Sequence, residues 1–346
     1  MKKILLTGLY VLLFCFGYTQ TETSSPYTFD TEALLSRVET LSSDQYAGRE
    51  TGTEGSILSQ ALIIEGFKQW GAEPLLKKYN QCFKFKRSGD KLIGENIVAK
   101  IKGTAQPEHY IVVSAHYDHL GIHDGEIHNG ADDNASGTSA LISFAEHLSK
   151  HPPNHSVILV AFDAEEKGLT GAKHFVKEFE NLSIVANLNM DMISRSAKNE
   201  LYVVGSRYTE GLQTIIDSFE NPTDTELLVG HDGSDDKQDW TNSSDHAPFH
   251  KKNIPFLYFG NEDHGYGIKN VFLNPGFTPM QGSDIALIEL EKSNQDCSLN
   301  AICTASLAPP SNEIPSSFLI SNDSSNSKDI SSDFVPPDAE VYVPAK

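Results

Sequence analysis

The sequence contains little of three things that would assign its class directly: cysteine, basic charge and long apolar runs. Its 346 residues include only 4 cysteines and no CxxC pair, so neither a disulfide scaffold nor a zinc knuckle is indicated. Lys and Arg number 27 against 47 Asp and Glu. This balance disfavours a nucleic-acid partner, because such binding rests largely on clustered basic residues. Beyond the N-terminus no apolar run is long enough to cross a membrane, and the length suits one catalytic domain with an additional piece.

Residues 1–20 have the pattern of an export signal. Lys2 and Lys3 precede an apolar stretch from Ile4 to about Phe16, and polar residues follow; this order is typical of a secretory signal. A membrane anchor is the alternative, but the apolar stretch is short and no basic stop-transfer cluster follows it. We therefore expect a secreted or periplasmic protein that has no stable membrane association once the signal is removed.

Strand-like and helix-like segments alternate along most of the remaining chain. Residues 29–70 repeat apolar side chains at helical spacing on both sides of a Gly-rich loop. Strand-like runs then alternate with helical stretches; the runs are NQCFKFK, NIVAKI, HYIVVSAH, SVILVAFDA and VANLNMD. This alternation predicts an α/β fold with a central sheet covered by helices on both faces. Ligands of such sheets bind in loops after the carboxyl ends of strands, and the candidate residues below all follow apolar runs.

The first candidate pair follows the run IVVSAH. His116 ends the run, and Asp118 stands two residues later. A carboxylate at this position can accept the second imidazole proton and so fix the tautomer that binds a metal. On its own the pair is a weak signal, because a histidine at a strand end is usually a surface or capping residue.

The second candidate lies in the loop GADDNASG, which opens a helix. Adjacent carboxylates at a helix start could act as simple N-caps. The flanking Gly130 and Gly137 allow a tight backbone turn, which would direct Asp132 inward as a ligand that bridges two ions.

The third candidate pair, Glu165 and Glu166, follows the run SVILVAFDA. Neighbouring side chains leave the backbone in different directions, so one glutamate can bind metal while the other faces the water that the metal activates. We assign Glu166 as ligand and Glu165 as general base. Two solvated glutamates at a helix start are the alternative.

Two further candidates complete a set of metal ligands. Asp191 ends an apolar run, where an unpaired carboxylate is costly unless a cation neutralises it. His246 lies in a polar loop before the run IPFLYF, with His250 as a weaker competitor. Two histidines and three carboxylates form a set that zinc accepts, and one shared carboxylate suits two ions about 3.5 to 4 Å apart.

The ordered motifs HYD, GADDNASG, EEKGLTGA, NMDMI and SSDHAPF resemble the M28 family of zinc aminopeptidases over roughly residues 30–264. The resemblance implies two Zn²⁺ per chain and a hydrolase whose partners are peptide substrates. It implies the mixed, largely parallel sheet of the zinc-peptidase fold. The implied metal ligands are His116, Asp132, Glu166, Asp191 and His246.

The resemblance also implies a role for each of these residues. His116 and Asp191 hold one zinc, Glu166 and His246 hold the other, and Asp132 bridges them. Glu165 is the general base, and Asp118 is the partner of His116. A cis peptide bond is implied between Asp132 and Asp133.

The C-terminal part departs from this resemblance. Residues 21–268 correspond to the M28-like domain, whereas residues 269–310 resemble a fragment of a trypsin-like serine protease in which Asp284 matches the triad aspartate. Neither a matching histidine segment nor a matching serine segment accompanies it, so serine-protease activity is rejected. Residues 311–346 are rich in Ser, Asn, Asp and Pro and are predicted to be disordered or linker-like.

Two alternatives stand beside an aminopeptidase. One is a glutaminyl cyclase-like enzyme with a single zinc, and the other is a catalytically impaired chimeric protein. Dipeptidase or carboxypeptidase action and the side-chain preference stay open at this point, because loops outside the motifs would shape the substrate pocket.

Overall fold

The structure, a computed structural model, describes residues 29–196, 198–221 and 223–262. Contacts divide the chain into two units, Met1–Ala308 and Pro309–Lys346, and every described residue belongs to the first. The predicted signal segment 1–20, the trypsin-like segment 269–310 and the tail 311–346 lie outside the described residues. Within the described residues, no helix combines the length and apolar character needed to cross a membrane.

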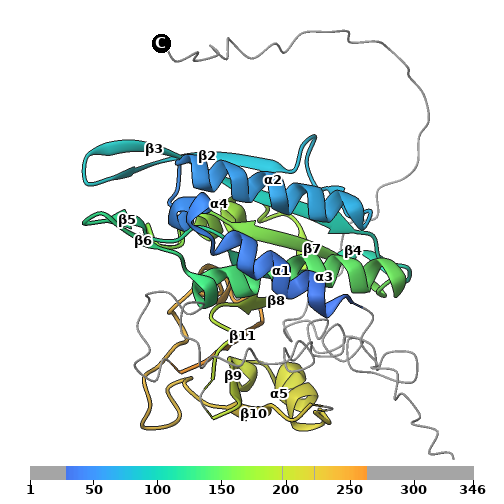
Figure 1. Cartoon of the computed structure of the whole chain (residues 1–346). Coiled ribbons are helices and arrows are strands. Elements are labelled where there is room, and N and C mark those ends of the chain that lie inside the picture. The colour runs from blue at the N-terminus through green and yellow to red at the C-terminus, as the bar shows by residue number, and fades with distance from the viewer. Residues whose placement is uncertain (1–28, 197, 222, 263–346) are drawn as a thin grey trace, which may run out of the picture. The chain divides into compact units, whose positions relative to one another are not determined.

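A nine-stranded mixed sheet forms the centre of the described unit (Figure 1). Its strand order is β1-β3-β7-β4-β8-β11-β9-β10, with β2 paired to β3. The strands are β1 (Glu73–Pro74), β2 (Asn80–Arg87), β3 (Asp90–Ile101), β4 (Gln106–His116), β7 (His155–Phe162), β8 (Ser183–Met190), β9 (Glu200–Val204), β10 (Glu226–Val229) and β11 (Phe256–Gly260). A separate hairpin pairs β5 (Gly121–His123) with β6 (Glu126–His128).

The central strands run parallel and the edges are mixed. The parallel pairs are β4 with β7, β4 with β8, β8 with β11, and β9 with β10. The pairs β1–β3, β2–β3, β3–β7 and β9–β11 are antiparallel. The predicted mixed α/β sheet is therefore confirmed, with its parallel character concentrated in the centre.

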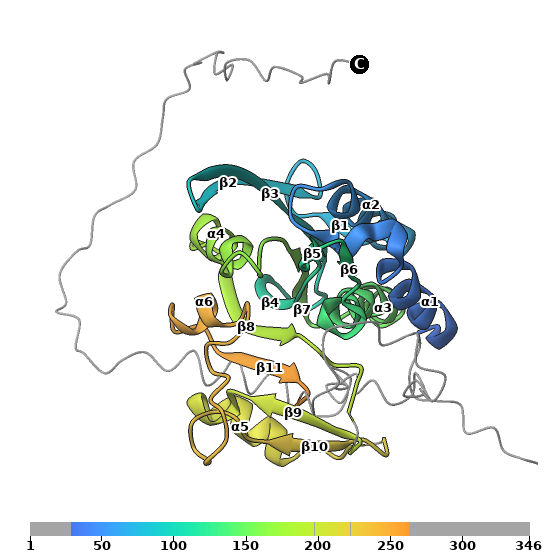
Figure 2. The same ribbon diagram turned by 60° about the vertical axis from the view of Figure 1, so that its left-hand side comes forward.

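Helices cover both faces of the sheet. They are α1 (Thr31–Leu41), α2 (Glu54–Gln69), α3 (Gly137–Lys150), α4 (Thr170–Glu178), α5 (Glu210–Asp217) and α6 (Ala247–His250). Three short helical turns are η1 (Asp44–Arg49), η2 (Ala131–Ser136) and η3 (Ser206–Tyr208). Figure 2 shows α1, α2 and α3 on one side of the sheet and α4 and α6 on the other. The elements β9, α5 and β10 were not predicted from the sequence.

Strand β7 shows why both faces need cover. Every one of its residues is buried, as expected for a central strand between two helical layers. Val157 and Leu159 pack in the core cluster that includes α1, α2 and α3, whereas Ile158 and Val160 pack with α4 and α6. Successive side chains of a strand point to opposite faces, so a continuous apolar run builds two cores at once.

The same strands bring the polar residues to one edge of the sheet. Because β4, β7 and β8 are adjacent and parallel, the residues that follow their carboxyl ends converge. The loop that opens α3 is tied to this edge as well. The Asn134 side-chain amide donates to the Met190 carbonyl at 3.0 Å, and the Thr138 hydroxyl donates to the His116 carbonyl at 2.8 Å.

Candidate metal centre

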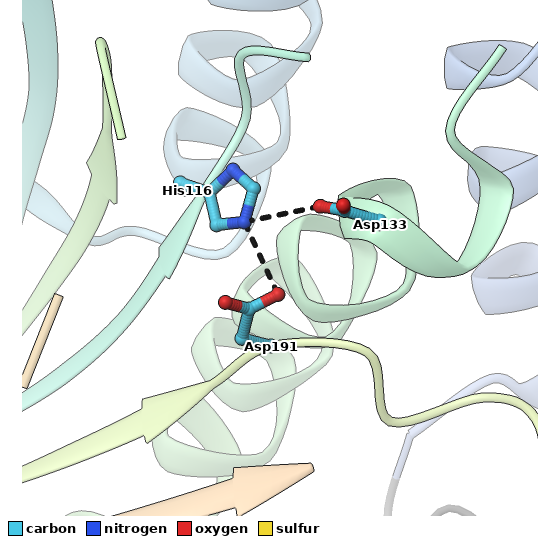
Figure 3. A group of neighbouring side chains, drawn as sticks. All are labelled: His116, Asp133 and Asp191. Atoms are coloured by element: carbon cyan, nitrogen blue, oxygen red, sulfur yellow. Dashed lines mark hydrogen bonds and ion pairs between the residues drawn. The ribbon is translucent and has the colours of Figure 1, made fainter. Parts of the chain in front are cut away.

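Three side chains from three different segments form a first candidate metal-binding group (Figure 3). His116 Nε2 lies 3.1 Å from an Asp191 carboxylate oxygen and 3.3 Å from an Asp133 carboxylate oxygen. Burial alone lowers the pKa of His116, but Asp191 and Glu165 raise it well above its ordinary value. The group therefore favours a positive charge at its centre.

Asp118 supports this group in a different way from the one predicted. His116 Nδ1 lies 3.0 Å from the Asp118 backbone carbonyl and 3.8 Å from its carboxylate. Since a carbonyl can only accept, Nδ1 donates and Nε2 faces the carboxylates. The Asp118 carboxylate instead accepts the backbone N–H groups of Glu165 at 3.0 Å and Glu166 at 3.3 Å. Asp118 therefore orients the turn that carries both glutamates.

A second group lies beside the first and shares Asp133 with it. His119 Nδ1 lies 3.0 Å from a Glu166 carboxylate oxygen and 3.7 Å from an Asp133 carboxylate oxygen. Its Nε2 is buried and has no hydrogen-bond partner among the residues that the structure describes. In each group the ligand atoms all lie within 4.8 Å of one another. Nitrogen and carboxylate donors of this kind fit zinc.

His119 was missed by the sequence reasoning. It stands three residues after His116, and the two histidines of HYDH at a strand end were the available signal.

The structure places the Asp132 carboxylate outside both candidate metal-binding groups of the described residues. Its carboxylate accepts the Ser194 backbone N–H at 2.9 Å and the Ser194 hydroxyl at 2.8 Å. It belongs to neither metal-binding group, and Asp133 takes the shared position. The cis peptide bond is Asp133–Asn134, not Asp132–Asp133. Adjacent side chains leave the backbone in different directions, and in η2 the second aspartate is the one that faces His116.

The structure also separates His246 from both groups. Its ring packs against Phe256 and Tyr258 of β11, with ring centroids 5.0 and 4.6 Å away. Its Nε2 lies 2.9 Å from the Trp240 carbonyl and donates to it. Burial lowers the pKa of His246 to about 4. The contacts described for the His246 ring are thus with aromatic rings and a carbonyl, and the competitor His250 likewise packs on Phe256, 5.0 Å between centroids.

Glu165 lies beside the first group without belonging to it. Burial raises its pKa to about 10; Asp191 and Asp245 add to this effect, and His116 opposes it. A cation in the neighbouring groups would lower this pKa toward neutrality. Such a carboxyl group can take and release a proton, as a general base must.

Members of both groups, but not His119, line a pocket of about 620 Å³. Its acidic wall consists of His116, Asp133, Glu165, Glu166 and Asp191. We call the aromatic lining residues His231, Trp240 and Tyr258 the aromatic wall. The His231 and Trp240 rings stack at 3.5 Å with an interplanar angle of 6°. The same pocket therefore contains the acidic residues, a stacked pair of rings and, beside that pair, the charged side chains of Lys237 and Glu262.

Residues 96–275, more than half of the chain, match the family model of peptidase family M28. The chain belongs to peptidase family M28. The family predicted from the ordered motifs is thereby confirmed. The trypsin-like resemblance of residues 269–310 stays a prediction.

Individual members of the M28 family agree with this assignment. The aminopeptidase YwaD of Bacillus subtilis is 30% identical over 207 residues, which make up 57% of this chain and 42% of YwaD. The aligned region spans less than half the length of the curated relatives that the chain matches.

Solved structures share the fold at low sequence identity. The zinc aminopeptidase BSAP from Bacillus subtilis superposes with a TM-score of 0.53 at 18% identity, covering 80% of this chain and 94% of that chain. A glutaminyl cyclase from Fimbriiglobus ruber gives 0.58 at 19% identity, covering 76% and 94%. Both therefore support the M28 fold and leave the reaction to be argued from the site.

Proposed function

We propose that this M28 chain is a zinc-dependent aminopeptidase that removes N-terminal residues from peptides. The observation that carries the proposal is the convergence of two metal-binding groups on Asp133, in one pocket that also contains Glu165. The aminopeptidases among the relatives support release from the amino end.

Each metal-binding group holds one Zn²⁺ in this proposal. His116, Asp133 and Asp191 bind the first ion, and His119, Asp133 and Glu166 bind the second. Zinc supplies Lewis-acid chemistry for amide hydrolysis when it is bound. Glu165 accepts the proton of the attacking water and passes it to the leaving amine, while the Asp118 carboxylate keeps the Glu165–Glu166 turn in place.

We further propose that the protein acts outside the cytoplasm. The export pattern of residues 1–20 supports a secreted or periplasmic location. Fractionation of cells that express the full chain, followed by N-terminal sequencing of the mature protein, tests this. Full-length protein retained in the cytoplasm would contradict it.

The test of the function combines kinetics with metal analysis on one preparation of the full chain. The wild-type protein is expected to release amino acids from aminoacyl anilides and to contain two zinc ions. Glu165→Gln is expected to lower kcat by about 10² to 10⁴, the range for loss of a general base, with both zinc ions retained. Glu39→Gln, on the exposed face of α1, is the matched control and keeps the wild-type rate. Near-native turnover by Glu165→Gln would show that another group is the base.

A peptide-library digest separates the remaining reactions. Free N-terminal peptides are expected to shorten from the amino end, and their N-acetylated counterparts to resist. A glutaminyl cyclase is the second candidate, because one such enzyme has this fold; it would act only on N-terminal glutamine, release ammonia and need one zinc. Shortening from the carboxyl end would indicate a carboxypeptidase. A chain that binds zinc and leaves every peptide intact would be the catalytically impaired protein.

A further inference from the structure

Arg49 is a fully buried arginine, 0% exposed, at the end of η1. All its hydrogen bonds among the described residues go to backbone carbonyls and none to a carboxylate. Nε donates to one carbonyl at 2.9 Å, Nη1 to two at 2.7 Å, and Nη2 to two at 2.8 and 3.4 Å. The acceptors are the carbonyl oxygens of Leu41, Tyr117, Asn129, Gly130 and Asp133.

These acceptors belong to three segments of the chain, and the candidate ligands come together only if two of these segments keep a fixed relative position. Leu41 ends α1, Tyr117 lies between His116 and His119, and the remaining acceptors form the loop that carries Asp133. A guanidinium has five N–H donors in a rigid planar fork, and here each has an acceptor. One side chain therefore ties the end of β4 to the loop of the shared carboxylate.

An unusual backbone conformation before Arg49 directs its side chain toward these carbonyls. Residues 47–49 have positive φ values of 46°, 66° and 52°. A Cβ at Gly48 would lie 2.5 Å from the His128 carbonyl oxygen and 2.6 Å from that of Gly121. The chain at position 48 thus passes too close to the β5–β6 hairpin for any side chain. The next residue, Arg49, reaches the backbone carbonyls of the loops that carry the candidate ligands.

The charge of Arg49 also acts on the metal centre. Burial lowers its pKa to about 10, and Asp133, Asp118 and Glu166 oppose that shift. The guanidinium therefore stays positive at neutral pH and favours the ionised form of the nearby carboxylates, which is the form that binds cations.

We propose that Arg49 is a positioning residue of the metal centre, which fixes the backbone on both sides of the two groups before a cation binds. This role rests on the proposed zinc function. Lysine cannot replace arginine here, because an ammonium keeps the charge and lacks the planar fork.

The test compares Arg49→Lys with Arg37→Lys. Arg37 is a matched control, because burial lowers its pKa too, but it donates to the Ser143 hydroxyl at 2.8 Å on α3, away from both groups. Zinc affinity is measured by competition with a chromogenic chelator, zinc content by mass spectrometry, and melting temperature without metal by calorimetry.

Arg49→Lys is expected to weaken zinc binding by about 10- to 100-fold, as for loss of a residue that orients metal ligands. At saturating zinc its kcat returns to within a few fold of wild type. Arg37→Lys lowers the melting temperature and keeps wild-type zinc affinity. If Arg49→Lys lowers the melting temperature and binds zinc as the wild type does, its role is only structural and the proposal fails.

If Arg49→Lys does not fold without metal, zinc is titrated while folding is followed by circular dichroism. A residue that only positions ligands is compensated by excess zinc through mass action. A chain that stays unfolded at saturating zinc overturns the proposal. Zinc binding by wild type without hydrolysis overturns the function alone, whereas wild type that binds no zinc overturns both.

Discussion

The two walls of the pocket are built in different ways. The acidic wall comes from the ends of the adjacent parallel strands β4, β7 and β8 and from the loop before α3. The aromatic wall comes from β11 and from the chain between β10 and α6. In the acidic wall, histidine nitrogens face carboxylates; in the aromatic wall, rings stack on rings. Both candidate metal-binding groups thus lie in the acidic wall, whereas the aromatic wall consists of ring contacts, with His231 also paired to Glu262 at 2.9 Å.

Two histidines illustrate the contrast. His119 and His246 are both fully buried, and within the described part of the chain each has one ring nitrogen without a hydrogen-bond partner. His119 lies beside the carboxylates of Glu166 and Asp133, whereas His246 packs against the rings of Phe256 and Tyr258. Burial and residue type alone therefore do not identify a metal ligand; the neighbouring charge does.

The largest effect on zinc content and activity is expected when the adjacent Asp132 and Asp133 are replaced in separate variants. Asp133→Asn removes the carboxylate that both metal-binding groups share, so zinc content and activity should both fall, activity by about 10³-fold, equivalent to several kcal/mol of lost metal stabilisation. Asp132→Asn is the matched control and should retain both zinc ions. Metal analysis and anilide hydrolysis measure the two outcomes. Loss of zinc in Asp132→Asn with retention in Asp133→Asn would reverse the assignment.

Removal of metal should lower the melting temperature of the protein and leave the aromatic wall unchanged. With zinc in about 1,000-fold excess over its Kd, binding stabilises the folded protein by about 4 kcal/mol. Chelation should therefore lower the melting temperature by roughly 10 °C for a domain of this size. The aromatic wall should stay intact, and Trp240 fluorescence below the melting transition should not change. An unchanged melting temperature would mean that the acidic wall folds without help from cations.

Replacing the two histidines separately sharpens the comparison further. His119→Ala should release one of the two zinc ions, with affinity at that position reduced at least about 10- to 100-fold. His246→Ala should keep both ions and lower only the melting temperature, because it opens a cavity between aromatic rings. Zinc titrations on both variants measure how many ions each one binds. Loss of one zinc ion in His246→Ala would show that His246 is a ligand, as the sequence predicted.

The smallest effect is expected on the aromatic wall. Trp240→Ala removes an aromatic surface worth about 0.5–1.5 kcal/mol in a stacked contact, so KM should rise by about 3- to 10-fold with kcat and zinc content near wild type. The chain has 2 tryptophans, and Trp70→Ala serves as the control, because Trp70 contacts Lys150 away from the pocket. A lower kcat with an unchanged KM in Trp240→Ala would contradict this prediction and indicate that the aromatic wall contributes to the chemical step.

The sequence alone was sufficient for the family, the α/β alternation and the types of residue in the site. His116, Glu166 and Asp191 each follow a buried apolar run, and parallel strands carry such positions to one edge. The structure accordingly brings all three together. Their zinc-binding roles remain for the metal analyses to test.

Only the tertiary structure decided which neighbour in a pair faces the centre. Ser194, distant in sequence, binds the Asp132 carboxylate, and His246 contacts the Trp240 carbonyl and the rings of Phe256 and Tyr258. Local patterns determine where a strand ends, because they reflect burial along a short stretch of chain. The direction of a single side chain depends on contacts between remote segments, such as the five carbonyls that converge on Arg49, and no local pattern contains that information.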